Sequence, residues 1–459
     1  MDHFAYTLGC LHCEGVDLAQ VAQAVGTPTY VYSHATLKLH AERITDAFAE
    51  LKPLICFAVK CSPNIHVLRT LADCGLGMDV VSGGELARAL AAGVHPSKIV
   101  FAGVGKTDEE IRSALAVPHP DGTTAPIALF NVESQPELQA LQSHAANLGV
   151  QARCALRVNP GVKAGGHEYI VTATSQSKFG VGLEHARALL ARFGNNPHAP
   201  IVGLHMHLGS SILTPQPYAE ALRRVLALID HAAESGLTIQ SLDLGGGFGA
   251  DYQTGDAPAA VEYARVIVPM LRDRVARGLK IILEPGRTIA ANAGVLLTRV
   301  LYVKQGHAEG EDKKFIICDA GMQTLLRPSL YGAFHFIWPT SVVPGQEPTR
   351  RDENLNLPGL ELADVVGPVC ESGDFLAKGR ALPPVARGDL LAVFTAGAYG
   401  ISMASRYNSH PLPAEVLVHG NDFHLIRRRE TIAELLEHEL NANPCPEGTG
   451  EGTGKGGDI

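Results

Sequence analysis

The chain has 459 residues, of which 46% are apolar and 19% charged, and it carries a formal net charge of −9. This composition predicts a globular protein with a large core and excludes the strongly basic surface that a nucleic-acid-binding protein needs. An apolar run long enough to span a bilayer is missing from the sequence, as is a signal-peptide pattern at Met1–His3, so we expect a cytoplasmic protein.

The nine cysteines are scattered and odd in number, which indicates reduced intracellular thiols. Cys10 and Cys13, with His3 nearby, resemble half of a zinc site. A second pair at a suitable spacing does not follow, so we predict no structural metal.

The N-terminal third begins with a short predicted strand at Thr29–Tyr32 and an amphipathic helix over 35–51. Eight strand-like runs then alternate with helical patterns across about 250 residues. The runs end at Lys60, Val81, Gly103, Asn131, Asn159, His207, Leu244 and Glu284. This rhythm predicts an α/β fold, a (β/α)8 barrel of the TIM type over 35–290. A doubly wound open sheet is the alternative, but it places its site at one switch point, whereas polar or glycine-rich residues follow most of these runs.

The pattern of predicted secondary structure changes after about residue 290. Strand-like runs at Val295–Lys304, Lys314–Asp319 and Leu390–Thr395 are separated by turns, which predicts a C-terminal β-rich domain of sandwich-like or barrel-like form over 291–440. Residues 342–359 are polar and rich in proline, so we expect an exposed insertion. The glycine-rich tail, 441–459, has too few apolar residues to form a core, and we expect it to be disordered.

The run from Leu54 ends on a single lysine, Lys60, and Pro63 prevents a regular strand beyond it. A lysine buried at such a point must be paired or have a lowered pKa, and such lysines form Schiff bases with carbonyl compounds. Taken alone, the stretch is more typical of a lysine that extends from a strand end to water, and only the other motifs of the chain reverse this preference.

Two later strand ends carry groups suited to an anion or a ring nitrogen. Glycines at Gly245–Gly247 allow close approach of a backbone to a phosphate, although a tight turn would need them too. Glu284-Pro285-Gly286-Arg287 offers a carboxylate for a protonated ring nitrogen and a guanidinium for a phosphate or carboxylate. A surface ion pair is the alternative.

A third strand end, His205-Met-His207-Leu-Gly-Ser210, places two histidines on one face if the strand alternates regularly. A metal site or an imidazole stacked on a cofactor ring fits this pattern. In the second domain, three polar clusters stand out, each of which alone is more typical of a loop or core position. They are Arg327–Tyr331, Cys370–Asp374 and Gly397–Tyr399.

These motifs occur in the order seen in pyridoxal-phosphate-dependent decarboxylases of the alanine-racemase-like fold. The segment Ser177-Lys-Phe-Gly180 and the cluster Arg327–Tyr331 most closely resemble the diaminopimelate decarboxylases. The resemblance covers about Tyr30 to Asn408, and residues 342–359 and the tail lie outside it.

The resemblance implies that residues 1–34 join the C-terminal domain and that two chains form a homodimer with sites at the interface. It implies a covalent link between Lys60 and pyridoxal 5'-phosphate, a ring-nitrogen contact at Glu284 and a proton donated by Cys370 of the other chain. The other implied cofactor-binding residues are Asp79, His207, Ser210, Gly245, Gly246, Gly247, Pro285, Gly286, Arg287 and Tyr399. The implied substrate-binding residues are Arg287, Arg327, Tyr331, Glu371 and Tyr399.

The function that follows is decarboxylation of meso-2,6-diaminopimelate to L-lysine and CO2, the last step of lysine biosynthesis. The nearest alternative is a decarboxylase of the same fold that acts on lysine, ornithine or carboxynorspermidine. A non-catalytic pyridoxal-phosphate-binding protein would usually lack the second domain, and a racemase would need two bases, for which Cys370 is a poor fit.

Overall fold

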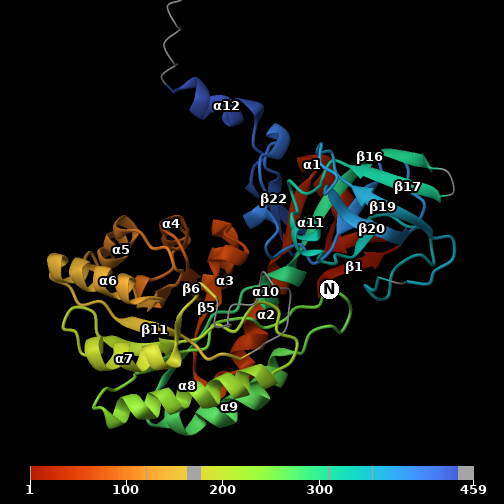
Figure 1. Cartoon of the computed structure of the whole chain (residues 1–459). Helices are drawn as coiled ribbons and strands as arrows, with labels where there is room; N and C mark the ends of the chain where they lie inside the picture. The colour runs from red at the N-terminus through yellow and green to blue at the C-terminus, as the bar shows by residue number, and fades with distance from the viewer. Residues whose placement is uncertain (1, 120, 163–176, 309–310, 354, 443–459) are drawn as a thin grey trace, which may run out of the picture.

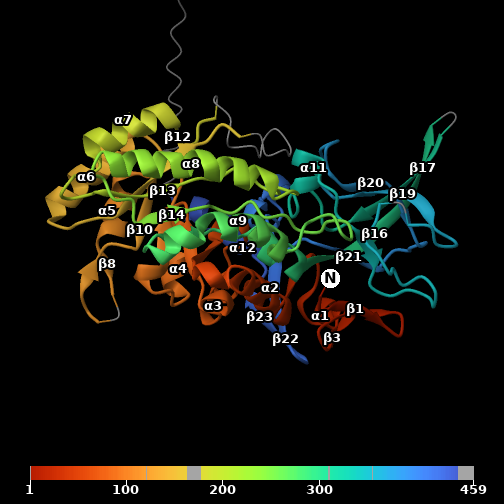
Figure 2. The same ribbon diagram turned by 90° about the horizontal axis from the view of Figure 1, so that it is seen from below.

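The computed structural model describes residues 2–119, 121–162, 177–308, 311–353 and 355–442. Two parts lie side by side in Figure 1, with a ring of strands and helices at the lower left and a β-rich domain at the upper right. Figure 2 shows the same two parts after a quarter turn. None of the helices within the described ranges combines the length and the apolar composition that crossing a bilayer requires.

The first part is an eight-stranded parallel barrel, as predicted. Its strands follow one another around the ring in chain order, and the pairing of the fourth with the fifth closes the ring. These strands are β5 (Leu54–Ala58), β6 (Gly77–Val80), β7 (Ile99–Phe101), β10 (Leu129–Val132), β11 (Cys154–Asn159), β13 (Ile201–His205), β14 (Ser241–Asp243) and β15 (Lys280–Leu283). A short strand, β12 (Val181–Gly182), extends the sheet beside β11.

Helices follow most of these strands and cover the outside of the barrel (Figures 1 and 2). They are α2 (His34–Ala47), α3 (Ile65–Asp73), α4 (Gly83–Ala91), α5 (Asp108–Leu115), α6 (Gln135–Leu148), α7 (Leu183–Phe193), α8 (Gln216–Glu234), α9 (Ala260–Ala276) and the short α10 (Arg287–Ala290). Capping side chains fix several of their starts. Ser33, Asn64 and Ser82, for example, each accept a hydrogen bond from a backbone N–H in the first turn.

The barrel interior is layered because strand side chains alternate between inside and outside. One layer is apolar and is formed by Cys56, Val100, Leu129, Ala155, Val202 and Ile282. A second layer lies two residues further along the strands. In three of them the inward side chain of this layer is polar, namely Asn131, Arg157 and Glu284. Alternation therefore places a polar layer at the carboxyl ends of the strands, where barrel enzymes carry their sites.

The second part is a mostly antiparallel sheet, as the turn-separated strands predict. Its main path runs β20-β19-β17-β16-β4-β22-β23, and β18 and β21 pair beside β16. The strands are β4 (Thr29–Ser33), β16 (Gly294–Ala308), β17 (Glu311–Cys318), β18 (Ile337–Pro339), β19 (Glu361–Val366), β20 (Phe375–Leu382), β21 (Leu390–Val393), β22 (Ala414–His419) and β23 (Asp422–Arg427). The early strand β4 lies inside this sheet, antiparallel to β16 and parallel to β22.

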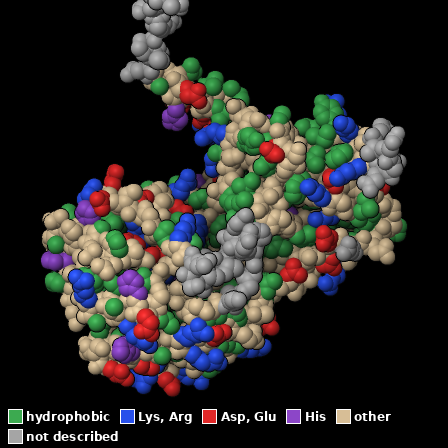
Figure 3. Space-filling model, in the orientation of Figure 1, with side chains coloured by type: hydrophobic (Ala, Val, Ile, Leu, Met, Phe, Trp, Pro, Cys, Tyr) green, Lys and Arg blue, Asp and Glu red, His purple; other side chains and the backbone are tan. Residues whose placement is uncertain are grey.

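Smaller elements complete the chain. They are the hairpin strands β1 (Phe4–Thr7), β2 (Cys10–Cys13) and β3 (Val16–Asp17), the pair β8 (Val117–Pro118) and β9 (Thr124–Ala125), and the helices α1 (Leu18–Val25), α11 (Arg327–Tyr331) and α12 (Ile432–Leu440). Helix α12 stands away from the rest of the protein and exposes apolar side chains (Figures 1 and 3). Most of the predicted disordered tail, residues 443–459, lies outside the described residues.

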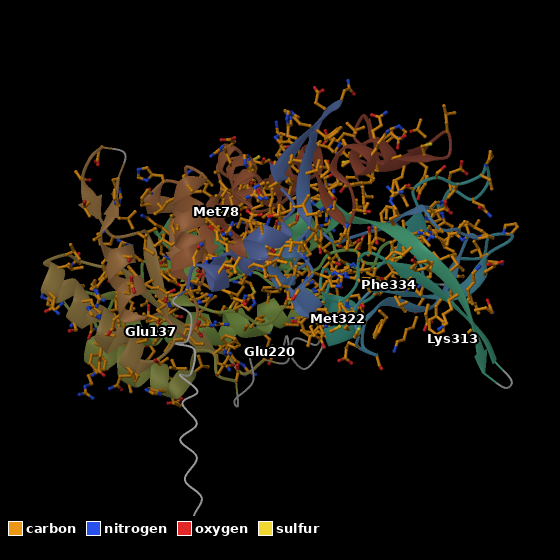
Figure 4. All side chains as sticks on the ribbon, turned by 90° about the horizontal axis from the view of Figure 1, so that it is seen from above. Met78, Glu137, Glu220, Lys313, Met322 and Phe334 are labelled. Atoms are coloured by element: carbon orange, nitrogen blue, oxygen red, sulfur yellow. The ribbon has the colours of Figure 1, made fainter. Side chains whose placement is uncertain are left out.

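Figure 4 marks the junction between the two parts. Glu220 of α8 and Met322 of the β-rich domain lie near this junction, whereas Glu137 and Lys313 lie at opposite ends of the molecule. The groups described next come from strand ends of the barrel and from loops of the β-rich domain on its barrel side.

Candidate active site

Lys60 lies at the mouth of the barrel, in a single 3-10 turn (Val59–Cys61) that directly follows β5. Its Nζ lies 2.6 Å from Oδ2 of Asp79, which is fully buried, while the Lys60 side chain keeps 35% of its surface exposed. Burial alone would lower the pKa of Lys60, but the charge and hydrogen bond of Asp79, together with the charges of Tyr399 and Glu284, outweigh burial and raise that pKa above its ordinary value. The lysine is therefore paired, as its position predicts, and still accessible to a ligand.

The β-rich domain holds the turn that carries Lys60. The backbone N–H of Tyr399 donates to the carbonyl of Cys61 at 2.8 Å. Asn64, just beyond the turn, donates to Glu415 of β22 at 3.0 Å. Tyr399 has a φ of 55°, which is uncommon for a non-glycine residue and typical of strained functional loops. The second domain thus takes part in shaping the lysine site.

A buried polar cluster spans the barrel interior below Lys60. Asn131 on β10 donates to Asp243 on β14 and to Glu284 after β15, at 3.0 Å in both cases. Because β10 is not adjacent to either of these strands, both hydrogen bonds must cross the barrel. His205 at the end of β13 brings its Nε2 within 3.3 Å of Glu284 Oε2.

The charge in this cluster is concentrated on Glu284. Burial alone would raise its pKa, but the interaction with His205, the charge of Lys60 and a hydrogen bond with Asp243 together outweigh burial and lower the pKa of Glu284. Burial, and then the charge of Glu284, raise the pKa of Asp243 well above its ordinary range. The proton of this carboxyl pair therefore resides on Asp243, and Glu284 remains anionic. An anion held this way is suited to a protonated ring nitrogen.

His207 lies beyond the end of β13, so strand alternation does not extend to it. Its Nδ1 accepts a hydrogen bond from the N–H of Gly246 at 3.3 Å. Burial, and then the charges of Arg157 and Lys60, lower the pKa of His207 well below its ordinary value, so the imidazole is neutral. A neutral ring beside the lysine is suited to stacking on an aromatic cofactor.

The glycine run after β14 packs so closely against its neighbours that a side chain would not fit. A Cβ at Gly246 would come within 2.1 Å of the Glu284 carbonyl oxygen, and Gly247 has a φ of 100°. Both positions therefore require glycine. The run brings its backbone close to Glu284-Pro285-Gly286, the next strand end of the barrel.

Arg287 lies beside this run. It donates to Ser210 Oγ through Nε at 3.3 Å and NH2 at 2.8 Å, and through NH1 to the Tyr252 hydroxyl at 2.6 Å. Its guanidinium also lies 4.7 Å from the centroid of the Tyr399 ring.

Arg327 of α11 is the second buried arginine of the site. Arg287 and Arg327 each expose only 6% of their surface. In the part of the chain that the structure describes, no aspartate or glutamate forms an ion pair with either of them. Burial, and then the charge of Arg287, lower the pKa of Arg327. Two buried cations without a carboxylate partner favour an anionic ligand.

Tyr331 is half-buried, and its ring centroid lies 5.7 Å from the Arg327 guanidinium. Cys370 and Glu371 are exposed in the turn between β19 and β20. Within the described ranges, neither residue forms a hydrogen bond or an ion pair with Lys60 or its partners. The single chain thus brings together the predicted barrel residues with Arg327, Tyr331 and Tyr399, but it leaves Cys370 and Glu371 on the surface.

Sequence reasoning missed Asn131, Asp243 and Tyr252. Asn131 ends one predicted strand and Asp243 lies one residue before the end of another, so their position at the mouth of the barrel was available from the sequence. Their contact was not, because it depends on which strands face each other across the interior. His205, Asp243 and Glu284 bring atoms capable of binding a metal within 4.8 Å of one another. Both carboxyl oxygens of Asp243 already accept hydrogen bonds, from Asn131 and from the N–H of Gly245.

The residues present fit pyridoxal phosphate. An accessible lysine faces an anionic carboxylate that is poised for a ring nitrogen, with a neutral imidazole alongside. Ser210 and the glycine run supply a hydroxyl and the close backbone approach that a phosphate requires. The set contains one group for each functional part of that cofactor.

Comparison with known proteins places this geometry in context. Residues 34–291 match the family model described as pyridoxal-dependent decarboxylase, pyridoxal binding domain. The diaminopimelate decarboxylase of Pseudomonas aeruginosa is 46% identical over 440 residues, which cover 96% of this chain and 99% of that protein.

Solved structures give the same result. The Helicobacter pylori diaminopimelate decarboxylase complexed with L-lysine is 37% identical with a TM-score of 0.82, covering 92% of this chain and 99% of that one. The enzyme from M. jannaschii in co-complex with L-lysine is 33% identical with a TM-score of 0.85, covering 96% and 98%.

Proposed function

Because the chain belongs to the diaminopimelate decarboxylase family of pyridoxal-dependent decarboxylases, we propose that the Lys60 site removes CO2 from meso-2,6-diaminopimelate and releases L-lysine. The observation that carries the assignment is the pair of buried guanidiniums, Arg287 and Arg327, beside the lysine and without acidic partners in the described ranges. A substrate with a carboxylate at each end supplies the missing anions, whereas lysine and ornithine have only one.

The cofactor in this proposal is pyridoxal 5'-phosphate bound at Lys60. When bound, it would supply an electron sink for the pair left on the α-carbon after CO2 departs. Lys60 would hold it covalently through Nζ, and Asp79 would orient that amine. Ser210, Tyr399 and the turn Gly245–Gly247 would hold its phosphate end, which leaves the Arg287 guanidinium for a substrate carboxylate.

The remaining residues would control protons and orientation. Glu284 would keep a proton on the ring nitrogen, because Asp243 rather than Glu284 carries the proton of the carboxyl pair. His207 would pack against the ring face. Arg327 and Tyr331 would bind the substrate carboxylate that is retained, which fixes the other one for loss.

The protonation step requires a donor that the single chain does not place near Lys60. We propose that two chains form a homodimer in which Cys370 and Glu371 of one chain enter the site of the other. Cys370 Sγ would deliver the proton to the α-carbon, and Glu371 would bind the distal ammonium group. The exposure of both residues in the single chain fits this arrangement.

The substitution Arg327→Lys tests the proposed specificity. A planar guanidinium that grips a carboxylate is poorly replaced by an ammonium, so kcat/KM for meso-diaminopimelate should fall by about tenfold or more. Cofactor content, measured by absorbance and by release in alkali, should stay at the wild-type level. Arg299→Lys is the matched control, because Arg299 is a half-buried arginine of the same domain whose NH1 donates to the Gly388 carbonyl. Unchanged kinetics in Arg327→Lys would move the substrate pocket elsewhere.

A further inference from the structure

Tyr252 lies between the two buried arginines of the site. Its hydroxyl accepts a hydrogen bond from Arg287 NH1 at 2.6 Å, and its ring centroid lies 5.1 Å from the Arg327 guanidinium. Its ring also forms a T-shaped pair with the ring of the buried His335, with the ring centroids 5.3 Å apart. One phenol thus contacts two like charges, through its oxygen on one side and its π face on the other.

The loop that carries Tyr252 has little regular structure of its own. Its neighbour Thr254 instead forms a reciprocal pair of hydrogen bonds with Arg351 of the insertion. The Thr254 N–H donates to the Arg351 carbonyl at 3.2 Å, and the Arg351 N–H donates to Thr254 Oγ1 at 2.9 Å. Arg350 NH2 donates to the Thr254 carbonyl at 3.1 Å, and the Glu353 N–H donates to Gln253 Oε1 at 3.2 Å.

The Arg351 side chain extends inward from these contacts. Its NH1 lies 2.9 Å from Thr395 Oγ1, 3.4 Å from Asn292 Oδ1 and 3.5 Å from the Asp251 carbonyl. It therefore connects the Tyr252 loop to the segment after α10 and to the strand end that leads to Tyr399. The composition predicts an exposed insertion, but Arg351 is half-buried and forms these contacts with the rest of the protein.

We propose that residues 349–353 of the insertion act as a clamp that holds Tyr252 between Arg287 and Arg327 and so sets the affinity of the site for the substrate carboxylates. Tyr252 and Arg351 are positioning residues in this account. The hydroxyl fixes the direction of the Arg287 guanidinium, and the ring separates its charge from that of Arg327. The inference rests on the proposed function, since the carboxylates are those of the proposed substrate.

A double-mutant cycle on the holoenzyme tests the clamp, with Tyr252→Phe, Arg351→Gln and the combined variant. Tyr252→Phe removes one hydrogen bond but keeps the ring, so KM for meso-diaminopimelate and Kd for L-lysine should rise about three- to tenfold. The kcat should change much less than KM. Because Arg351 acts through Tyr252, the combined variant should be no worse than the more affected single variant.

Hydrogen exchange provides a measurement that does not depend on turnover. Arg351→Gln should increase the exchange of the backbone amides of residues 251–256, whereas the matched control Arg299→Gln should leave them unchanged. If Arg351→Gln does not fold, Thr254→Val removes the acceptor of the Arg351 N–H and replaces it in the cycle.

Two results would overturn the clamp. One is multiplicative loss in the combined variant, and the other is wild-type KM and lysine affinity in Tyr252→Phe. A wild-type enzyme that does not convert meso-diaminopimelate would instead refute the proposed function. The exchange measurement would still decide whether the insertion holds the loop.

Discussion

Replacing Lys60 with alanine should abolish decarboxylation, with a loss of about 10³-fold or more, because the substitution removes the amine at the mouth of the barrel that is placed to bind the cofactor covalently. Lys60 is the lysine paired with Asp79 at the mouth of the barrel, and its charge interacts with Glu284 and His207. Purified Lys60→Ala protein should lack the yellow colour and the visible absorption band of the wild type. CO2 release and absorbance spectra give the measurement.

Two controls separate chemistry from folding in this prediction. Lys60→Arg keeps a positive charge beside Asp79 but cannot form the covalent link, so it should fold normally and remain inactive. Lys98→Ala changes an exposed lysine that bonds only a backbone carbonyl, Gly75, and should retain activity. Substantial activity in Lys60→Ala, with cofactor bound, would place the covalent link on another residue.

The second large effect concerns Cys370. A Cys370→Ala homodimer should be badly impaired, by about 10²-fold or more, because the substrate carbon lacks its proton donor. Yet Cys370 is exposed on its own chain and does not contact the Lys60 group within the described residues. We therefore expect the deficiency to be repaired by a partner chain that carries an intact Cys370.

Mixing the two inactive variants provides the test. In a heterodimer of Lys60→Ala and Cys370→Ala chains, one site carries both substitutions and is inactive. The other site has an intact Lys60 from one chain and an intact Cys370 from its partner. Random exchange of equal amounts makes about half of the dimers mixed, so about a quarter of wild-type activity should return.

Differential tagging of the two chains verifies the exchange. Cys10→Ala serves as the matched thiol control, since Cys10 is half-buried in the N-terminal hairpin, and this variant should stay fully active. If exchange is complete and activity stays at the level of the separate variants, Cys370 does not act across an interface.

Much of the barrel could be predicted because local signals repeat. Each predicted strand ends in a polar or glycine-rich turn, and the carboxyl ends of the strands in a closed parallel barrel meet at one mouth. Lys60, His207, Gly245–Gly247 and Glu284 were accordingly predicted to lie together. The mixed order of the second sheet, in which β4 lies between β16 and β22, depends on contacts between residues nearly 400 positions apart and leaves no local trace.

The missed site residues share one physical cause. The Asn131–Asp243 bond requires that β10 and β14 face each other across the barrel, a consequence of ring closure rather than of either strand. Tyr252 lies in an irregular loop that forms hydrogen bonds with the distant insertion, and its hydroxyl contacts Arg287. Such relationships arise from tertiary packing, so periodicity and motif spacing do not encode them.

The measurement that tests the central claim most directly is product formation by the purified holoenzyme. The holoenzyme should release CO2 and L-lysine in equal amounts from meso-diaminopimelate. Its kcat/KM for this substrate should be at least about 10²-fold above the values for L-lysine and L-ornithine, because each of these has one carboxylate and leaves one guanidinium without a partner. Equal or faster release of CO2 from L-lysine or L-ornithine would contradict the assignment. So would the conversion of meso-diaminopimelate without the formation of L-lysine.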